Sequence, residues 1–385
     1  MARLEGRGKL SSLKYRVLLL NWRDLNNPLA GGAEQHIWEV FRRLASRGWE
    51  VEVLCARYSE AVSNETIQGI GVTRIAHPSI YHLALPKAYR RMVRRFRPHV
   101  VVDFMNKLPL YTPLFVKEPL CCFVHHLFGS SAIRELGLLP GLGVWAYERP
   151  VPWVYSNTPF LTGSHSSVEE LQALGLHNVV PDPMPYGVDT TAFRPGQRAD
   201  RPTLLYLGRL KRYKGVDHII RVLPALRERI PDIHLNIAGT GDDRAHLEHL
   251  AEQLGVVNTV SFLGFVSEEE KLRRYQEAWL TCLPSYKEGF GLTIPEAALC
   301  ETPTVGYNVP GLRDAIEDQK TGVLVPYGKL DTLTESLYGL LVDHRRRQRM
   351  GENAREHYAT FTWDQAAEHM QTWLMDLIEK SPICR

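Results

Sequence analysis

Glu288 and Glu296 are separated by seven residues in a glycine-bearing stretch, residues 285–299. An apolar strand is expected before this stretch, and a helix is expected to begin near Pro295, since proline suits the first helical turn. Glycine lets backbone N–H groups come close to a ligand, and a helix N-terminus favours an anion. The two carboxylates could accept hydrogen bonds from sugar hydroxyls. The stretch therefore suits a ligand with phosphate and sugar, although a plain strand-loop-helix corner would use the same residues.

Arg209 and Lys214 flank a second loop, which follows an expected strand at Thr203–Leu207. An arginine grips phosphate oxygens with its planar fork, whereas a lysine acts as a point charge. Both side chains could reach one diphosphate from this loop. Basic residues in loops are usually only solvated, so this spacing alone leaves both interpretations open.

Gly31 and Gly32 stand between a continuous apolar run, residues 15–21, and a segment with helical periodicity. Such a run is typical of a strand that is buried on both faces. Strand, glycine pair and helix again place backbone where a phosphate can approach it. The full G-x-G-x-x-G pattern is absent, so the motif is weak as a dinucleotide fingerprint.

His125 and His126 follow an expected strand at Cys121–Val124. Open α/β sheets bind ligands at the carboxyl ends of their parallel strands, which makes His125 a candidate site residue. His126 is the less favoured of the two, and one of the pair is expected to be structural or exposed. No third ligand with metal-like spacing accompanies them, so we reject a zinc site.

Apolar strand-like runs alternate with helical segments along the whole chain, which predicts an α/β fold with parallel sheets and right-handed crossovers. The 385 residues are too many for one compact core. We expect two domains of roughly 190 residues each. The expected divisions are a basic tail at 1–14, a first domain at 15–190, a second domain at 191–360 and a final helical segment at 361–385.

The composition is that of an ordinary globular protein, with 44% apolar and 23% charged residues. A net charge of +3 is too small to indicate nucleic-acid binding. The six cysteines form no C-x-x-C pair, which predicts buried free thiols in a reducing cytoplasm. The first dozen residues do not resemble a signal peptide, and no apolar run reaches the roughly 18 residues of a membrane span. We expect a cytoplasmic protein, and peripheral attachment to the inner face of the plasma membrane stays open.

The segment Lys87–Arg97 is strongly basic and has apolar residues at helical spacing. The simpler interpretation is a surface helix whose apolar stripe packs on the sheet. The alternative is contact with anionic lipid headgroups, where each Lys or Arg near the surface contributes about 1 kcal/mol.

Together, these segments resemble glycosyltransferase family 4, whose GT-B fold has two Rossmann-like domains that face each other across a cleft. The resemblance extends from about Tyr15 to about Lys380. It rests on the strings AGGAEQ, VHH, YGVDTTAF, LGRLKRYKG, IAGTG, LGFV and LPSYKEGFGLTIPEA, in this order. WRDLNNPLAGGAEQHIWEV and VVVDFMNKLPLYTP also resemble a bacterial and archaeal branch that is often found near surface-polysaccharide genes.

The resemblance implies a donor site in the second domain. Arg209 and Lys214 would bind the diphosphate of the donor and stabilise the leaving nucleoside diphosphate. Glu296 would accept hydrogen bonds from the ribose hydroxyls, and Glu288 would hold hydroxyls of the donor sugar. Backbone N–H groups would assist at Phe290, Gly291 and Leu292.

The resemblance also assigns roles to residues elsewhere. Gly31 and Gly32 would approach the phosphate and sugar from the first domain, and His125 would lie beside the reacting sugar. Phe265 and Val266 would place backbone atoms next to the base. The final helix would cross back onto the first domain. Residue 301 is Glu where relatives commonly have Gly, which predicts a local change after the preceding helix.

The implied reaction moves a hexosyl group from a UDP- or GDP-linked sugar to a glycan or lipid-linked acceptor, with retention at the anomeric carbon. No Asp-x-Asp motif occurs, so we expect neither a divalent metal nor another cofactor. We find no residue that we would name as a nucleophile, which favours a front-face route in which the departing phosphate takes the acceptor proton. The alternatives are a nucleotide-sugar 2-epimerase-type isomerase and a non-catalytic nucleotide-sugar-binding protein on the same fold.

Overall fold

Two compact units make up the protein, and a computed structural model describes residues 14–106, 108–125 and 137–381 of it. Each unit has its own sheet and its own apolar core. Unit 1 contains the described residues up to Thr162, then Val168–Met184 and the residues from Asp364 onward. Unit 2 contains Gly163–Ser167 and Pro185–Trp363.

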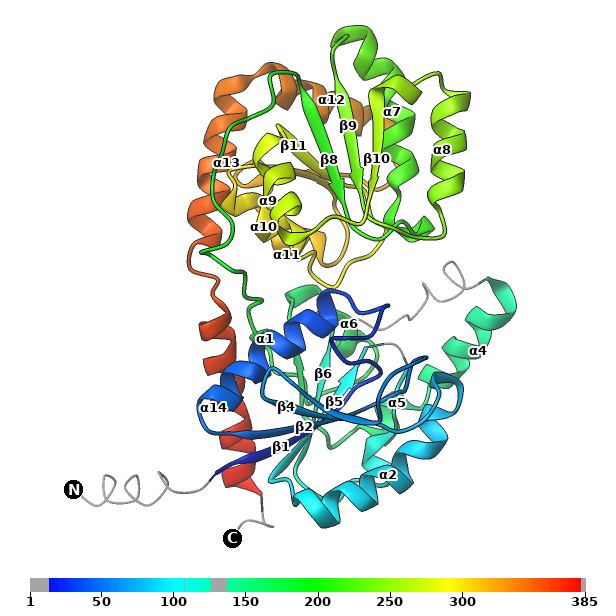
Figure 1. The fold of residues 1–385 in the computed structure, drawn as a ribbon, viewed down its shortest axis with the longest axis vertical. Coiled ribbons are helices and arrows are strands. Elements are labelled where there is room, and N and C mark those ends of the chain that lie inside the picture. Colours follow the sequence, from blue (N-terminus) through cyan, green and yellow to red (C-terminus); the bar gives the residue numbers. More distant parts are fainter. Residues whose placement is uncertain (1–13, 107, 126–136, 382–385) are drawn as a thin grey trace, which may run out of the picture. The chain divides into compact units, whose positions relative to one another are not determined.

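Unit 1 is built around a seven-stranded sheet with the order β3-β4-β2-β1-β5-β6-β7 (Figure 1). Neighbouring strands run parallel except β3, which pairs antiparallel with β4 at one edge. Every residue of β5 is buried, as expected for a central strand covered on both faces. The strands are β1 (Arg16–Leu20), β2 (Glu50–Cys55), β3 (Asn64–Ile67), β4 (Ile70–Arg74), β5 (Val100–Met105), β6 (Leu120–Val124) and β7 (Phe160–Thr162).

The last helix of the chain belongs to unit 1 and packs beside the first helix of that unit (Figure 1). Arg43 and Arg47 of α1 lie 3.3 and 3.4 Å from the Asp364 carboxylate of α14. The helices are α1 (Gly32–Ser46), α2 (Tyr81–Phe96), α4 (Leu138–Glu148), α5 (Val151–Val154), α6 (His165–Ala173), which begins in unit 2, and α14 (Trp363–Lys380).

Unit 2 has a six-stranded parallel sheet with the order β10-β9-β8-β11-β12-β13. Its strands are β8 (Thr203–Leu207), β9 (His234–Ala238), β10 (Val260–Gly264), β11 (Leu280–Leu283), β12 (Thr304–Tyr307) and β13 (Gly322–Val325). Its helices are α7 (Val216–Arg229), α8 (Arg244–Gln253), α9 (Glu268–Glu277), α10 (Thr293–Leu299), α11 (Leu312–Ala315), α12 (Leu330–Val342) and α13 (His344–Tyr358).

The predicted α/β class is confirmed, and most predicted elements occur close to their expected positions. The β3–β4 hairpin and the helices α4, α5 and α11 were not predicted. The helix expected near Pro295 begins at Thr293, which makes the proline its third residue. A proline there removes no intrahelical hydrogen bond, because the N–H groups of the first turn have no helical partner.

Glu301 adopts the left-handed backbone conformation, with φ at 58°. Its carbonyl accepts a 2.7 Å hydrogen bond from Arg198, and its carboxylate lies 3.0 Å from Arg355. A Cβ on Gly351 would lie 2.2 Å from that same carbonyl, so the helix α13 approaches here through a glycine. Glu301 thus adopts a backbone conformation that glycine favours, and the expected local change after α10 stays a prediction.

Five cysteines fall within the described residues, and all five are buried free thiols, as predicted. They are Cys55, Cys121, Cys122, Cys282 and Cys300. Among the described helices, none is both long and apolar enough to cross a membrane. His126, Cys384 and the predicted basic tail, apart from Lys14, lie outside the described residues.

Candidate active site

The strand order of unit 2 has a switch point between β8 and β11. The chain proceeds from β8 through β9 to β10 on one side, and then returns to β11, β12 and β13 on the other. Loops that leave neighbouring strands in opposite directions open a crevice, where α/β sheets bind their ligands. The loop after β8 carries Arg209 and Lys214, and the loop after β11 carries Glu288. Lys214 and Glu288, which are 74 positions apart, thus meet at one place, as parallel strand ends require.

Lys214 and Glu288 form an ion pair at this switch point. The Nζ atom of Lys214 lies 2.5 Å from Oε1 of Glu288, and the two side chains are only 13% and 12% exposed. The hydroxyl of Ser285 donates to the same carboxylate oxygen at 2.7 Å. The backbone N–H of Tyr286 donates to the carbonyl of Tyr213 at 2.8 Å, which joins the two loops a second time. Cation and carboxylate therefore come from separate loops that are fixed to each other.

Two glycines make this close approach of the loops sterically possible. Gly215 has a φ of +64°, and a Cβ there would lie 2.3 Å from the carbonyl oxygen of Pro284. Gly311 has a φ of +85°, and a Cβ there would lie 2.3 Å from the carbonyl oxygen of Glu288. Any larger residue would have to move the backbone that carries Glu288.

Arg209 lies on the same loop as Lys214 and has an exposed side chain. Its guanidinium donates a 3.1 Å hydrogen bond to the Tyr213 hydroxyl, and its carbonyl accepts a 2.9 Å bond from the Tyr206 hydroxyl. The ring of Tyr213 also lies 5.2 Å from Nζ of Lys214. Tyr213 therefore stands between the two cations and holds both near the end of β8.

The backbone that precedes α10 offers hydrogen-bond donors. Within the described ranges, no acceptor receives the N–H groups of Phe290, Gly291 or Leu292. The buried Phe290 ring stacks on Tyr186 with 4.7 Å between the ring centroids, which fixes this segment. Gly291 has a φ of +84°, so the turn into α10 uses glycine's access to the left-handed region. These N–H groups are available to an anion or to a sugar oxygen.

Glu296 is buried and already hydrogen-bonded within unit 2. Nζ of Lys271 lies 3.0 Å from one carboxylate oxygen, and the hydroxyl of Tyr275 donates to the other at 2.8 Å. Burial raises the pKa of Glu296, and Lys271 and Tyr275 oppose that rise. The two donors, both from α9, fix the orientation of the carboxylate, and each oxygen retains capacity for a further hydrogen bond.

Backbone atoms of the loops after β8, β9 and β10 form the rest of this edge of the sheet. A Cβ on Gly239 would lie 1.9 Å from the carbonyl oxygen of Gly208, so these loops touch through glycine. The N–H of Gly239 donates to the carbonyl of Gly264 at 2.7 Å. Phe265 and Val266 follow directly, and the Phe265 side chain is 86% exposed. A flat ligand could therefore approach the backbone here closely.

A second polar cluster lies in unit 1, where β1 and β5 form the corresponding switch point. Asn106, after β5, donates from Nδ2 to Oδ1 of Asn21, after β1, at 2.7 Å. Nδ1 of His125, after β6, lies 2.6 Å from Oδ1 of Asn106. Because this amide oxygen only accepts, the Nδ1 atom of His125 carries a proton in this assignment.

His36 of α1 completes the cluster, with its Nδ1 atom 3.2 Å from Nε2 of His125. Burial lowers the pKa of His36 to about 3, so its ring is neutral. Both ring nitrogens of His125 thus have partners, one on α1 and one in the loop after β5, and these partners fix the orientation of this predicted site residue.

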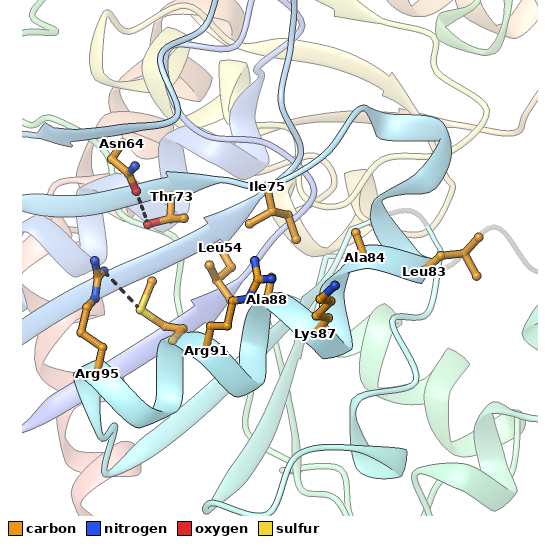
Figure 2. A pocket seen from close by; sticks show the side chains of 11 residues that line it. Leu54, Asn64, Thr73, Ile75, Leu83, Ala84, Lys87, Ala88, Arg91 and Arg95 are labelled. Atoms are coloured by element: carbon orange, nitrogen blue, oxygen red, sulfur yellow. Dashed lines mark hydrogen bonds between the residues drawn. The ribbon is translucent and has the colours of Figure 1, made fainter.

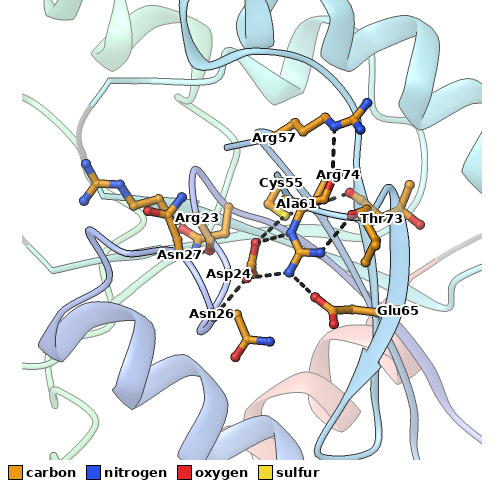
Figure 3. Close-up of polar contacts among 12 residues, drawn as sticks. Arg23, Asp24, Asn26, Asn27, Cys55, Arg57, Ala61, Glu65, Thr73 and Arg74 are labelled. Carbon is orange, nitrogen blue, oxygen red and sulfur yellow. Dashed lines mark hydrogen bonds and ion pairs between the residues drawn. The ribbon is translucent and has the colours of Figure 1, made fainter. Parts of the chain in front are cut away.

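The loop between β1 and α1 is anchored by a buried ion pair (Figure 3). Arg74 at the end of β4 donates to both carboxylate oxygens of Asp24, at 2.7 and 2.8 Å, and neither side chain is exposed. Arg74 also contacts the Glu65 carboxylate. At the end of the loop, Glu34 accepts a 2.8 Å bond from the N–H of Gly31, whose φ of −152° is extended. The glycine pair therefore stands on a rigid loop.

Two family models match the chain. Glycosyltransferase Family 4 matches residues 30–192, and Glycosyl transferases group 1 matches residues 188–357. A D-inositol 3-phosphate glycosyltransferase from Kribbella flavida is 33% identical, and the alignment covers 88% of this chain and 89% of that protein. The chain belongs to glycosyltransferase family 4. The chain spans only about half the length of several other curated relatives that have the same name.

Solved structures show that this member of family 4 has the GT-B fold. Sucrose-phosphate synthase from Thermosynechococcus elongatus aligns with a TM-score of 0.83 at 20% identity, covering 96% of this chain and 100% of that chain. The Anabaena protein Alr3699/HepE, solved in complex with UDP-glucose, aligns with a TM-score of 0.75 at 17% identity, covering 94% and 99%.

Several residues that touch the predicted site residues were missed by sequence reasoning. Lys271 is a basic residue on the inward face of α9, one turn before Tyr275. This position within the helical pattern could have identified it as a buried cation. Asn21 and Asn106 each directly follow an apolar strand, as His125 does. His36 offered no signal beyond its position in an amphipathic helix. The remaining missed residues are Tyr213, Ser285, Asp24 and Arg74.

The predicted basic segment forms most of α2, whose last helical residue is Phe96. Its apolar stripe packs on the sheet as expected. Between this helix and the strands β2–β4 lies a groove of about 440 Å³ (Figure 2). Three cations line the groove along the helix, namely Lys87, Arg91 and Arg95. Arg95 lies 3.6 Å from Glu52, so one of these cations has a carboxylate nearby.

Proposed function

We propose that this family 4 glycosyltransferase transfers a hexosyl group from a UDP- or GDP-linked sugar to a glycan or lipid-linked acceptor, with retention and without a metal. The observation that carries the proposal is the meeting of Lys214 and Glu288 at the switch point of unit 2. A diphosphate needs cations and N–H donors, and a sugar needs a carboxylate within a few ångströms of them. The crevice offers all three.

The proposed donor pose follows from the groups around the crevice. The diphosphate lies against Arg209 and Lys214, with the sugar at Glu288 and at the N–H groups that precede α10. Glu296 receives the ribose hydroxyls, and the base lies against the backbone at Phe265 and Val266. The UDP-glucose complex of the Anabaena neighbour supports a UDP-sugar as the first donor to examine.

In the proposed transfer, the bond between the anomeric carbon and the phosphate oxygen breaks, and its electron pair goes to that oxygen. The acceptor hydroxyl forms the new bond on the same face, and its proton passes to the departing phosphate. Negative charge on the diphosphate increases during this step, so preorganised cations stabilise the transition state more than the ground state. Arg209 and Lys214 supply that charge. His125 is proposed to lie beside the reacting sugar.

For a lipid-linked acceptor we propose a cytoplasmic enzyme that meets an anionic surface at the inner face of the plasma membrane. The support is the basic face of α2, a helix that contains no acidic residue. Lys87 and Arg91 extend along the groove at one helical turn apart, which suits phosphate headgroups. No nucleic-acid partner is proposed.

The stereochemistry of the released sugar tests the reaction. Incubation with UDP-glucose and an acceptor panel, followed by proton NMR, should give an α-linked glycoside in the presence of EDTA. Without an acceptor, slow hydrolysis should release the α-anomer first. A β-product would contradict retention, an epimerised donor would indicate an isomerase, and donor binding without turnover would indicate a binding protein. Glu288→Gln should lose turnover, and Lys211→Ala, in the loop that carries Lys214, should keep it.

A further inference from the structure

Helix α4 of unit 1 is apolar and exposed around almost its whole circumference. Its sequence, LLPGLGVWAYE, contains a single charged residue. Within α4 only Gly141 is buried, and Leu139 is 79% exposed. Trp153 of the following helix α5 is 73% exposed. The large apolar side chains of this region that face solvent are Leu138, Leu139, Leu142, Trp145, Tyr147 and Trp153.

A helix of this kind is unusual at a water-exposed surface. Surface helices turn an apolar stripe to the core and a polar face to water, and an apolar helix is normally covered. The basic helix α2 shows the ordinary pattern, since Leu85 and Tyr89 are buried and its cations are exposed. Contiguous exposed apolar surface marks a place where a protein or a membrane binds.

The neighbourhood of α4 indicates which of these it meets. The ring of Tyr147 in α4 packs edge-on against His82 of α2, with 6.2 Å between the centroids. The end of α4 thus meets the start of the basic helix, where Leu83 is also exposed. From Lys87 onward α2 presents cations, and the Arg149 guanidinium lies 5.1 Å from the Trp145 ring centroid. Leucine and tryptophan beside cations is the composition that enters the headgroup region of a bilayer.

We propose that α4 docks unit 1 on an anionic lipid bilayer, with its leucine and tryptophan side chains at the boundary between headgroups and acyl chains. A helix of 11 residues is about 16 Å long, so it lies in the interface and does not span the roughly 30 Å hydrocarbon core. The cations of α2 then meet the phosphates. The contact between the α2 cations and the phosphates rests on the membrane role proposed for α2 above. The insertion of α4 is inferred independently, from the exposure of its apolar side chains.

Vesicle co-sedimentation of the full chain tests the proposal. The wild type should bind phosphatidylcholine vesicles that contain phosphatidylglycerol, and should bind pure phosphatidylcholine vesicles more weakly. Leu138→Ser with Leu139→Ser should reduce binding to the anionic vesicles at least about tenfold, because the change removes most of the apolar surface that these two side chains would bury in the bilayer. Val257→Ser is the matched control, since Val257 is half-exposed in unit 2. Lys87→Glu with Arg91→Glu should weaken anionic binding and remove its salt dependence.

Fluorescence gives a second measurement that needs no leucine variant. Brominated acyl chains should quench tryptophan emission of the wild type, and Trp145→Phe with Trp153→Phe should remove most of that quenching. The proposal is overturned if the wild type does not bind the anionic vesicles, or if the leucine variant binds as well as Val257→Ser. It is also overturned if α4 instead joins two copies, which light scattering would reveal as a dimer that the leucine variant dissociates.

Discussion

The ammonium of Lys214 lies 2.5 Å from the carboxylate of Glu288, so the residue proposed to bind phosphate and the residue proposed to bind the sugar form an ion pair with each other. A donor that places a diphosphate at this crevice gives Lys214 a second anionic partner. The carboxylate of Glu288 then gains freedom to accept sugar hydroxyls. We propose that the pair thereby couples recognition of the phosphate to recognition of the sugar.

Substitutions of Lys214 and of Glu288 should have opposite effects on the affinity for UDP. Lys214→Ala should weaken UDP binding about tenfold to a hundredfold, because a charge-assisted hydrogen bond contributes about 1.5–3 kcal/mol. Glu288→Gln should leave the affinity for UDP unchanged or increase it, because Lys214 loses its competing carboxylate. Titration calorimetry with UDP measures both. Lys211→Ala, an exposed lysine paired with Asp242 in a neighbouring loop, is the control. Equal losses in both variants would contradict the coupling.

Removing Lys271 should destabilise unit 2 through Glu296. Lys271→Met leaves a buried carboxylate without its cation, and we expect a loss of about 3–5 kcal/mol in the free energy of unfolding at pH 7. Without the cation, burial raises the folded-state pKa of Glu296 further. A raised folded pKa gives stability at low pH that is lost as pH rises, so the deficit should shrink from pH 7 to pH 5. Urea unfolding measures it. Lys320→Met, at an exposed pair with Glu317, should change stability by less than about 1 kcal/mol.

Protonation of His36 should make the fold less stable in mild acid. Its folded-state pKa of about 3 lies below the ordinary value of 6.5, so its contribution is present above pH 6.5 and is lost as pH falls. This residue alone should remove about 2 kcal/mol between pH 6.5 and pH 5. His36→Gln should flatten the curve by that amount in urea unfolding. The control His249→Gln, at an exposed histidine, should leave the pH dependence of stability unchanged. If His36→Gln also leaves the slope of stability against pH unchanged, the buried His36 ring is not neutral.

Breaking the Asp24–Arg74 pair should affect both stability and the glycine loop. Arg74→Met leaves Asp24 charged and buried, and we expect a loss of about 3–5 kcal/mol. Arg74→Met combined with Asp24→Leu should recover much of that loss, because no buried charge remains. Chemical unfolding of the single and double variants decides this. If the double variant is as unstable as the single, the pair is not the source of the effect. The exposed Arg221→Met serves as the control.

The strand-loop-helix units were predictable because they follow from local patterns. Continuous apolar runs indicate the buried strands, and the residues after those runs fall at the carboxyl edge by the topology of parallel sheets. The sequence pattern alone therefore places Arg209, Lys214, Glu288 and His125 at strand ends. The α4 helix was not predicted, because one proline and two glycines interrupt its helical pattern.

The partners within each cluster could not be predicted in the same way. Asp24 and Arg74 are 50 positions apart, and His36 and His125 are 89 positions apart. Contacts at such separations depend on strand order and register, which local periodicity does not specify. The pairing of Lys214 with Glu288 belongs to the same class. The residues of the candidate site could be proposed from the sequence, whereas the ion pair between Lys214 and Glu288 could not.

The most direct test of the account is binding of a nucleotide sugar to the crevice of unit 2. Thermal unfolding should be followed with UDP-, GDP-, ADP- and dTDP-sugars, on the wild type, on Arg209→Ala and on the control Arg212→Ala. A ligand at about 100 times its dissociation constant should stabilise by roughly 2.7 kcal/mol, which is a shift of a few degrees. We expect such a shift with one nucleotide, and we expect it to be kept in Arg212→Ala and lost in Arg209→Ala. No shift with any sugar, or an equal shift in Arg209→Ala, would contradict it.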